Sequence, residues 1–394
     1  MDNYESVMTD GNVLYRAVLN AIDGSKWKER SQYSLNNILS LVFKIEDDLR
    51  NRTYKGGHEA TFTLHERGRL RRVDSFPVVD RAIRHALCDD IFAPKIKSKI
   101  IYDNGASVLN RGISHARKRF EVHLRKYYIE HGTNDGWILF WDFSKYYDNI
   151  LHDVAKEQLL DLVDHDEFIN WLLDVIFKSF ELDASTLTDE EYDDLYFGVL
   201  NRLVYDKKST PNSTRVIAKS ISIGDQLSQQ IGIWYPHRID NYIKIVKSQK
   251  YYGRYMDDCY IISDSKEELL EILHEIVEIC KPLGLHINAR KTHLTKLSST
   301  YKFLQIKYSL TPSGKVIKRI NPKRVVAMKK RLRKLSTKVK DGSIDYINVE
   351  NTFKSWMGSY YKLLSKKQRL SLISLYEELF NKSIHIDKGS MYII

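Results

Sequence analysis

The sequence predicts a fold of the α+β class, in which helices cover an antiparallel sheet. Three apolar and aromatic stretches have strand character: "WILFWDF" (137–143), "YYGRYM" (251–256) and "CYIIS" (259–263). The last two are separated by two residues, a spacing typical of a hairpin between antiparallel strands. A segment with helical periodicity, "SKEELLEILHEIVEICKPLG" (265–284), follows directly. A strand hairpin covered by such helices indicates the α+β class.

The elements that precede this core are expected to be mainly helical. Residues 1–60 include "YSLNNILSLVFKIEDDLRNRTY" (33–54), in which apolar positions recur at helix period. A short strand-like stretch, "EATFTLHERGRLRRVDSF" (59–76), comes next. Helices are then predicted around "DRAIRHALCDDIF" (80–92) and "GISHARKRFEVHLRKYY" (112–128). Between 136 and 310, short strands alternate with helices.

After a "TPSGK" turn (311–315), the sequence predicts mostly helical structure to the end. The segment 323–340 holds nine Lys or Arg residues, with apolar residues at helical spacing: Val325, Met328, Leu332, Leu335 and Val339. This pattern indicates an amphipathic helix with a basic outer face. That face is either simply solvated or a contact surface for nucleic acid.

Composition and charge narrow the function classes. The 394 residues are 43% hydrophobic, and no apolar run is long enough to span a membrane. The net charge of +11 suits a polyanionic partner, whereas residues 161–194 hold twelve acids against the single base Lys178 and are expected to form a solvated excursion. Three widely spaced cysteines fit an intracellular protein with free thiols, and the start, "MDNYESVMTDGN", lacks the pattern of a secretory signal.

Two adjacent acids, Asp257 and Asp258, separate the strands of the predicted hairpin. An isolated Asp pair is most often part of an ordinary turn. Here a third acid, Asp142, ends another apolar strand and is followed by the aromatic pair Tyr146 and Tyr147. If that strand pairs beside the hairpin, the three carboxylates converge, and divalent cations are needed to hold them together. Two Mg²⁺ ions, for which Mn²⁺ can substitute, are the usual arrangement for phosphoryl transfer.

The chain resembles reverse transcriptases in a series of motifs that covers roughly residues 45–310. "YMDD" (255–258), preceded by "DFSKYYDNI" (142–150), is similar to the palm of these enzymes. Further matching stretches are "FPVVDRAIRHAL" (76–87), "NGASVLNRGISHA" (104–116), "SISIGDQLSQ" (220–229), "LGLHINARKT" (283–292) and "YKFLQIKY" (301–308).

This resemblance implies a right-hand polymerase fold with fingers, an antiparallel-sheet palm and a helical thumb. The implied domains are an N-terminal helical region 1–60, fingers 61–135, a palm 136–310 with an acidic insertion at about 161–210, and a helical thumb 311–394. No further nuclease domain is expected, which suggests a stand-alone polymerase core.

Catalytic and metal-binding roles follow from the resemblance. Asp142, Asp257 and the backbone carbonyl of Phe143 are implied ligands of Mg²⁺, with Asp258 as a weaker or shared ligand. Lys291 corresponds to the lysine that donates a proton to the leaving pyrophosphate, and a solvated surface lysine is the alternative.

The resemblance also implies how nucleotide and nucleic acid are bound. Tyr147 stands at the aromatic steric gate that excludes a 2′-hydroxyl, with a core tyrosine as the alternative. Gly224 and Gln226 lie in the template- and nucleotide-positioning motif, and Arg71 or Arg72 offers a cation to the triphosphate. Predicted nucleic-acid contacts are Ser228, Arg111, Phe303, Leu304, Lys323, Lys330, Arg331 and Lys334.

Two positions depart from the family pattern. The common "PQGxxxSP" is here "SIGDQLSQ" (222–229), a form that resembles reverse transcriptases of diversity-generating retroelements and of bacterial antiphage defence. The "FLG" of the primer grip is "FLQ", so that Gln305 adds a side chain near the primer end. Template handling is therefore expected to differ from that of typical family members.

The predicted function is RNA-directed DNA synthesis that extends a primer with dNTPs to give a cDNA. The expected template is a dedicated non-coding RNA in antiphage defence, in the cytoplasm of a bacterium or encoded by a phage or prophage. An accessory protein or a second reverse transcriptase is a further candidate partner, and no membrane is expected. The alternatives are mutagenic copying in a diversity-generating retroelement, untemplated or protein-primed synthesis on the same palm, and a catalytically silent RNA-binding scaffold.

Overall fold

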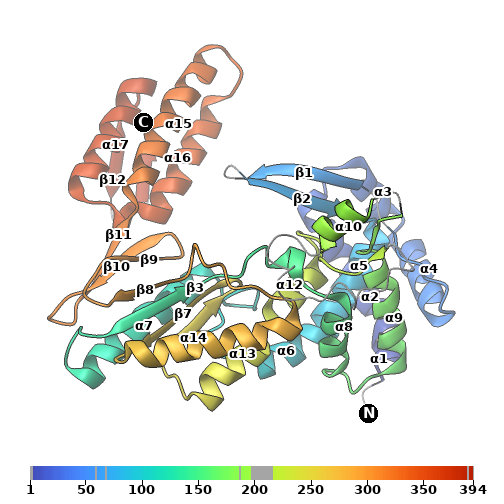
Figure 1. Ribbon diagram of the computed structural model, residues 1–394. Coiled ribbons are helices and arrows are strands. Elements are labelled where there is room, and N and C mark those ends of the chain that lie inside the picture. Colours follow the sequence, from blue (N-terminus) through green and yellow to red (C-terminus); the bar gives the residue numbers. More distant parts are fainter. Residues whose placement is uncertain are drawn as a thin grey trace. The chain divides into compact units, whose positions relative to one another are not determined.

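The computed structural model describes residues 3–57, 60–66, 69–185, 188–196, 216–387 and 390–393, and the chain divides into two compact units (Figure 1). The first unit comprises residues 1–120 and 137–294, and the second comprises residues 121–136 and 295–394. Helix α7 (Ile113–His131) begins in the first unit and ends in the second. The predicted α+β class with antiparallel sheets is confirmed.

The N-terminal part of the first unit is helical, as the periodicity predicted. It consists of α1 (Tyr4–Met8), α2 (Gly11–Ile22), α3 (Glu29–Asn36) and α4 (Ile38–Arg50). Asp10 caps α2, because its side chain accepts hydrogen bonds from the amides of Asn12 and Val13. The strand-like stretch that follows is an antiparallel hairpin of β1 (Ala60–Glu66) and β2 (Arg69–Ser75), and α5 (Val78–Ala86), a π-helix (Leu87–Phe92) and α6 (Ala93–Lys99) come after it.

The central sheet has the strand order β6-β7-β3-β8; β3, β6 and β7 belong to the first unit, which ends at Leu294 within β8. Its strands are β3 (Trp137–Trp141), β6 (Tyr252–Tyr255), β7 (Asp258–Ser263) and β8 (His293–Lys296). The residues of β3 and β7 are almost entirely buried, which explains why both sequences are apolar rather than alternating. Aromatic rings fill this core: Trp141 stacks on Tyr252 at 5.9 Å between ring centroids.

Helices and short strands complete the first unit. They are α8 (His152–Leu160), α9 (Glu167–Lys178), β4 (Leu182–Asp183), α10 (Asp189–Tyr196), β5 (Val216–Ile217), α12 (Gln226–Trp234), α13 (His237–Asn241) and α14 (Lys266–Cys280). Ser265 begins α14 by accepting a hydrogen bond from the Glu268 amide. Part of the predicted acidic excursion, residues 197–210, lies outside the described residues.

The second unit contains a three-stranded antiparallel sheet and a helical part. The sheet has the order β11-β10-β9, with β9 (Tyr301–Phe303), β10 (Ile306–Leu310) and β11 (Val316–Ile320). The helices are α15 (Pro322–Lys340), α16 (Tyr346–Tyr360) and α17 (Lys366–Phe380). As predicted, Val325, Met328 and Leu332 of α15 face the core of this unit, and Leu335 and Val339 pack against it.

The chain after 310 is mostly helical, as predicted, with strands at two places. Val316–Ile320 extends the β9–β10 sheet, and the chain ends in a hairpin of β12 (Ile384–Asp387) and β13 (Ser390–Ile393). Both segments alternate or cluster β-branched residues over only four or five positions, a signal too short to separate strand from helix. Within the part of the chain that the structure describes, no helix is long and apolar enough to cross a membrane.

Candidate active site

The hairpin that carries the two adjacent acids closes one residue earlier than the sequence predicted. Tyr255 pairs with Asp258, so the turn consists of Met256 and Asp257, and Asp258 is the first residue of β7. Met256 has φ +54°, a left-handed conformation that is uncommon for a residue with a side chain. The predicted Asp257–Asp258 turn is therefore corrected: the two carboxylates leave from a turn residue and a strand residue.

The third acid, Asp142, comes to this hairpin through the pairing of β3 with β7. Trp141 pairs with Cys259, so Asp142 follows the strand at the level of Asp258. Burial, together with the neighbouring charges of Asp258 and Asp142, raises the pKa of Asp257 to about 7. The three acids that the sequence singled out thus lie near enough for their charges to interact.

A short stretch after α14 holds Asp142 in place. The amide of Asn288 donates to the Asp142 carbonyl at 2.8 Å, the amide of Ser144 donates to the His286 carbonyl at 2.8 Å, and Phe143 forms a bridge with Ile287. The sequence patterns did not indicate that Asn288 belongs to the site, although it lies in the motif "LGLHINARKT". Its contact joins residues 146 apart, which no local pattern indicates.

Lys291 reaches the same carboxylate from its own loop. Its Nζ lies 2.5 Å from Oδ2 of Asp142, and its charge also lowers the pKa of Asp257. The lysine is therefore at the acid cluster rather than a remote surface residue, and its role as a proton donor stays a prediction.

The donor set suits hard divalent cations. Carboxylate oxygens of Asp142, Asp257 and Asp258, with the nearby Phe143 carbonyl, are the oxygen ligands that Mg²⁺ prefers. Burial first, and the charges of Asp258 and Asp142 second, disfavour the ionised form of Asp257, and a bound divalent cation would favour it.

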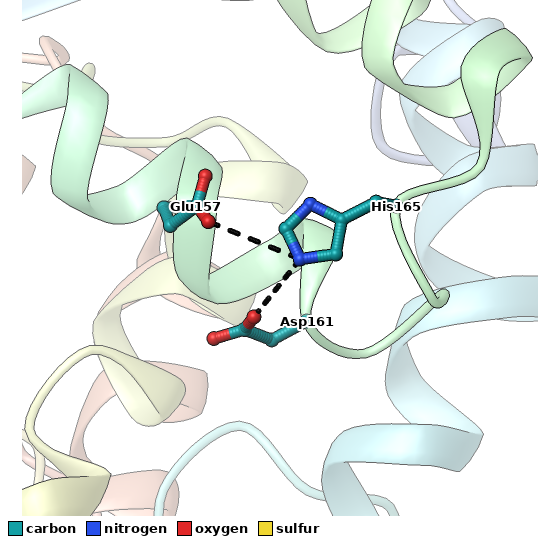
Figure 2. Close-up of side chains that lie close together, drawn as sticks. All are labelled: Glu157, Asp161 and His165. Carbon is teal, nitrogen blue, oxygen red and sulfur yellow. Dashed lines mark hydrogen bonds and ion pairs between the residues drawn. The ribbon is translucent and has the colours of Figure 1, made fainter.

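A separate cluster lies on the surface at the end of α8. Glu157, Asp161 and His165 place potential ligand atoms within 4.8 Å of one another (Figure 2). Their side chains are 64%, 53% and 53% exposed, and His165 Nε2 lies 3.2 Å from Asp161. Exposed acids at helical spacing commonly gather around a histidine without holding a metal, and this cluster is not part of the candidate active site.

Tyr147 lies close to the turn of Met256 and Asp257. A Cβ added to Gly232 of α12 would lie 2.7 Å from the Tyr147 hydroxyl and 3.7 Å from Sδ of Met256. Burial, together with the charges of Asp257 and Asp225, raises the pKa of Tyr147 to about 12. The ring thus stands beside the acids, as a steric gate requires, and its role stays a prediction.

The loop before α12 is shaped by a glycine and a buried ion pair. Gly224 has φ +103°, which only glycine adopts readily. Asp225 caps α12 and pairs with Arg84 at 3.1 Å, both side chains being almost fully buried. Ser228 is fully buried and its hydroxyl donates to Asp225, so a nucleic-acid contact would have to displace this bond. The Arg84–Asp225 pair was missed because nothing in the sequence relates the two positions.

A cavity of about 250 Å³ adjoins this loop. Its lining combines residues from the start of α3, from β1, β2 and α5 with the segment between them, and from the Gly224 loop: Lys28, Phe62, Asp74, Ser75, Phe76, Arg81, His85, Gly224, Asp225 and Gln226. The hairpin and the predicted nucleotide-binding loop therefore face a common space. Gln226 also donates to Asp89 of the π-helix.

The other predicted binding residues are distributed as follows. Arg71 and Arg72 lie in β2, and their side chains are outside the described residues. Arg111 donates to the carbonyls of Ile101 and Asn104. In the second unit, Phe303 and Leu304 are buried, whereas the basic residues of α15 are exposed: Lys323, Lys330, Arg331 and Lys334.

An acid cluster at a strand hairpin, beside an aromatic ring and a glycine loop, defines a candidate nucleotidyltransferase site. The sequence profile of the reverse transcriptase (RNA-dependent DNA polymerase) family matches residues 91–308, more than half of the chain. The chain therefore belongs to the reverse transcriptase family. No match was found among the curated protein sequences.

Two solved telomerase structures are similar to the chain. The telomerase of Candida albicans, in complex with the TWJ fragment of telomeric RNA, is 12% identical with a TM-score of 0.46, over 86% of this chain and 62% of its own. The apo telomerase of Candida tropicalis, truncated from its C-terminal domain, is 10% identical with a TM-score of 0.42, over 71% of this chain and 60% of its own. The chain thus spans less than two thirds of either telomerase chain, and the family assignment rests on the sequence match.

Proposed function

We propose that the protein is an RNA-directed DNA polymerase that extends a primer with dNTPs. The observation that carries this proposal is the meeting of Asp142 with the turn of Asp257 and Asp258 in a chain of the reverse transcriptase family. Asp142, Asp257, Asp258 and the Phe143 carbonyl would hold two Mg²⁺ ions. When bound, such ions activate the primer 3′-hydroxyl and stabilise the leaving pyrophosphate.

The remaining residues of the site would bind the substrates and supply a proton. Lys291, already at the Asp142 carboxylate, is the proposed proton donor to pyrophosphate. The Tyr147 ring, near Gly232 and Met256, would close the side of the site where a 2′-hydroxyl lies, and the Gly224–Gln226 loop with the adjoining cavity would receive nucleotide or template. The exposed cations of α15 would contact phosphates of the template–primer duplex.

The proposal is tested by removing two acids of the hairpin. We expect the double variant Asp257→Ala, Asp258→Ala to lose dNTP incorporation on a primed RNA template while its RNA affinity stays within about twofold of wild type. The matched control removes two exposed acids of the surface cluster, Glu157→Ala and Asp161→Ala, and should keep full activity. Wild-type protein that is inert on RNA and DNA templates with Mg²⁺ or Mn²⁺, yet binds RNA, would instead support a scaffold.

For the biological role, we propose copying of a dedicated non-coding RNA in antiphage defence, in a bacterial cytoplasm. The support is the "SIGDQLSQ" motif, which departs from the common family form toward that of defence-associated and diversity-generating enzymes. Sequencing the RNA that co-purifies with the protein, and the cDNA made from it, separates the roles. An abundant structured RNA with a defined or repetitive cDNA supports defence, whereas copies of a coding repeat altered at adenines support diversification. DNA made without any template indicates untemplated or protein-primed synthesis.

A further inference from the structure

Beneath the catalytic turn lies a buried charge that the proposed reaction does not use directly. Arg254 of β6 is 1% exposed, and so is its partner Asp240 of α13. Arg254 Nε lies 2.9 Å from one carboxylate oxygen of Asp240 and Nη2 lies 2.6 Å from the other, a bidentate pair. The Tyr252 hydroxyl donates to the same carboxylate at 2.5 Å. Asp240 is thus held from two sides and fixes the plane of the guanidinium.

Two further donors of this guanidinium bind backbone carbonyls. Nη2 donates to the carbonyl of Ile233, near the end of α12, at 2.8 Å. Nη1 donates to the carbonyl of Met256 in the turn at 3.3 Å. The main chain of Arg254 is fixed as well, because its amide donates to Asp103 and its carbonyl accepts from Gly105. Arg254 therefore connects the hairpin, α12 and the loop at 103–105.

Arg254 contacts the turn at the peptide that precedes Asp257, where the backbone conformation is uncommon. Met256 has a left-handed φ, and such conformations persist only where surrounding groups fix them. The carbonyl that Arg254 binds belongs to the peptide joining Met256 to Asp257, so its orientation sets the direction in which the Asp257 side chain leaves the turn. Without this hydrogen bond, the peptide can rotate toward a more common conformation and carry the carboxylate with it.

We propose that Arg254, oriented by Asp240, is a positioning residue that holds the Met256–Asp257 peptide in the conformation needed for metal binding. This inference rests on the proposed polymerase function. It assigns Arg254 an effect on the metal-binding geometry that goes beyond a contribution to overall stability. Lysine at this position keeps the charge but cannot bind Asp240 through two donors and Met256 through a third.

Hydrogen exchange tests the proposal without metal or substrate. In EDTA, Arg254→Lys should speed amide exchange in a peptide spanning 251–260 about tenfold or more, as expected for loss of a hydrogen bond from a charged donor. Leu172→Ala, a change to a fully buried core residue of α9, is the control for general destabilisation. At matched loss of Tm, that control should leave exchange in the turn at the wild-type rate.

Metal binding and kinetics give the second readout. By electron paramagnetic resonance, Arg254→Lys should bind Mn²⁺ about tenfold more weakly than wild type, and its half-saturating Mg²⁺ in dNTP incorporation should rise similarly. The kcat should fall while the KM for dNTP stays within about twofold, because the nucleotide loop keeps its own Arg84–Asp225 anchor. Tyr252→Phe, which removes a single hydrogen bond to Asp240, should shift both quantities in the same direction by about two- to threefold.

The results that overturn the proposal are as definite. The proposal is wrong if Arg254→Lys has the wild-type rate of amide exchange in the turn and the wild-type affinity for Mn²⁺. It is also wrong if Leu172→Ala changes both quantities as much as Arg254→Lys does. If Arg254→Lys does not fold, wild-type turn exchange and Mn²⁺ affinity in Tyr252→Phe would overturn the proposal instead. Wild-type protein without polymerase activity contradicts the proposed function, whereas exchange and Mn²⁺ binding still decide the role of Arg254.

Discussion

Among single residues, Asp257 shows most directly what the site demands of its surroundings. Its carboxyl is buried beside Asp258 and Asp142, and its pKa is raised to about 7 in the absence of metal. An aspartate in an unfolded chain has a pKa of about 3.9. Between these two values the folded protein therefore binds the proton that the unfolded chain has lost, and the contribution of this group to stability falls as the pH rises through that window.

Asp257→Asn removes the ionisable carboxyl and with it this decrease in stability at higher pH. In EDTA, we expect the variant to be more stable than wild type at about pH 8, by on the order of 4 kcal/mol, and to differ little at about pH 4, where Asp257 is largely protonated in the folded state and about half protonated in the unfolded chain. Thermal unfolding at the two pH values measures the difference. Equal stabilisation at both would mean that the charge of Asp257 is not the cause.

Tyr147 gives a prediction about sugar selectivity. Its hydroxyl lies next to Gly232, close to Met256 of the acid-bearing turn, so Tyr147→Ala is expected to open the space where a 2′-hydroxyl would lie. We expect the preference for dNTP over rNTP, measured as the ratio of kcat/KM values, to fall by about tenfold or more. Tyr147→Phe keeps the ring and should keep the preference. An unchanged ratio in the alanine variant would remove Tyr147 from the gate.

At the scale of elements, the turn between β9 and β10 explains why glycine suits the position that Gln305 occupies in this chain. Phe303 pairs with Ile306, which leaves Leu304 and Gln305 as a two-residue turn, and both have positive φ, +42° and +72°. Such turns favour glycine, and a side chain at positive φ is strained. The glycine that the family has at this position thus matches the backbone conformation, and Gln305 adopts it at a cost.

Gln305→Gly should therefore stabilise the protein by about 1 kcal/mol, because relief of strain outweighs the greater freedom of glycine in the unfolded chain. Denaturant unfolding, followed by a spectroscopic signal from the second unit, measures this difference in the free energy of unfolding. Leu304→Gly is the matched comparison and should destabilise, since Leu304 has the same sign of φ but a buried side chain. A loss of stability in Gln305→Gly would show that Gln305 makes a compensating contact.

For the whole molecule, the uneven charge is the property that bears on binding. The net charge is +11, although residues 161–194 hold twelve acids, so the rest of the chain is strongly basic. On α15, Lys330, Arg331 and Lys334 are exposed while the apolar side of the helix faces the core of the second unit. This division gives the helix an exposed cationic face, as a phosphate-binding surface requires.

Replacing Lys330, Arg331 and Lys334 by glutamine should weaken binding to a template–primer duplex regardless of its sequence. The slope of log affinity against log salt should fall by about one for each phosphate that the helix no longer neutralises. Fluorescence anisotropy at several salt concentrations measures both quantities. A triple variant with the wild-type slope would show that this face does not contact phosphates.

The class of the fold and the main elements of the site could be predicted from local sequence. Apolar strands ending in Asp142 and flanking Asp257 and Asp258 were visible because strand character and acids are properties of neighbouring residues. Gly224 was identifiable for the same reason, since its positive φ depends on the local chain. The helical N-terminus and the amphipathic α15 followed from periodicity over long segments, where the signal is strongest.

The distant residues that support the site became visible only in the folded chain. Asn288 at Asp142, Arg84 at Asp225 and Asp240 at Arg254 are pairs that chain folding brings together, and no spacing in the sequence relates them. The one-residue shift of the turn between β6 and β7 likewise results from strand register, which depends on pairing with a partner and not on the propensity of either strand. Local sequence was therefore enough to identify the acids, whereas their arrangement in space depends on long-range packing.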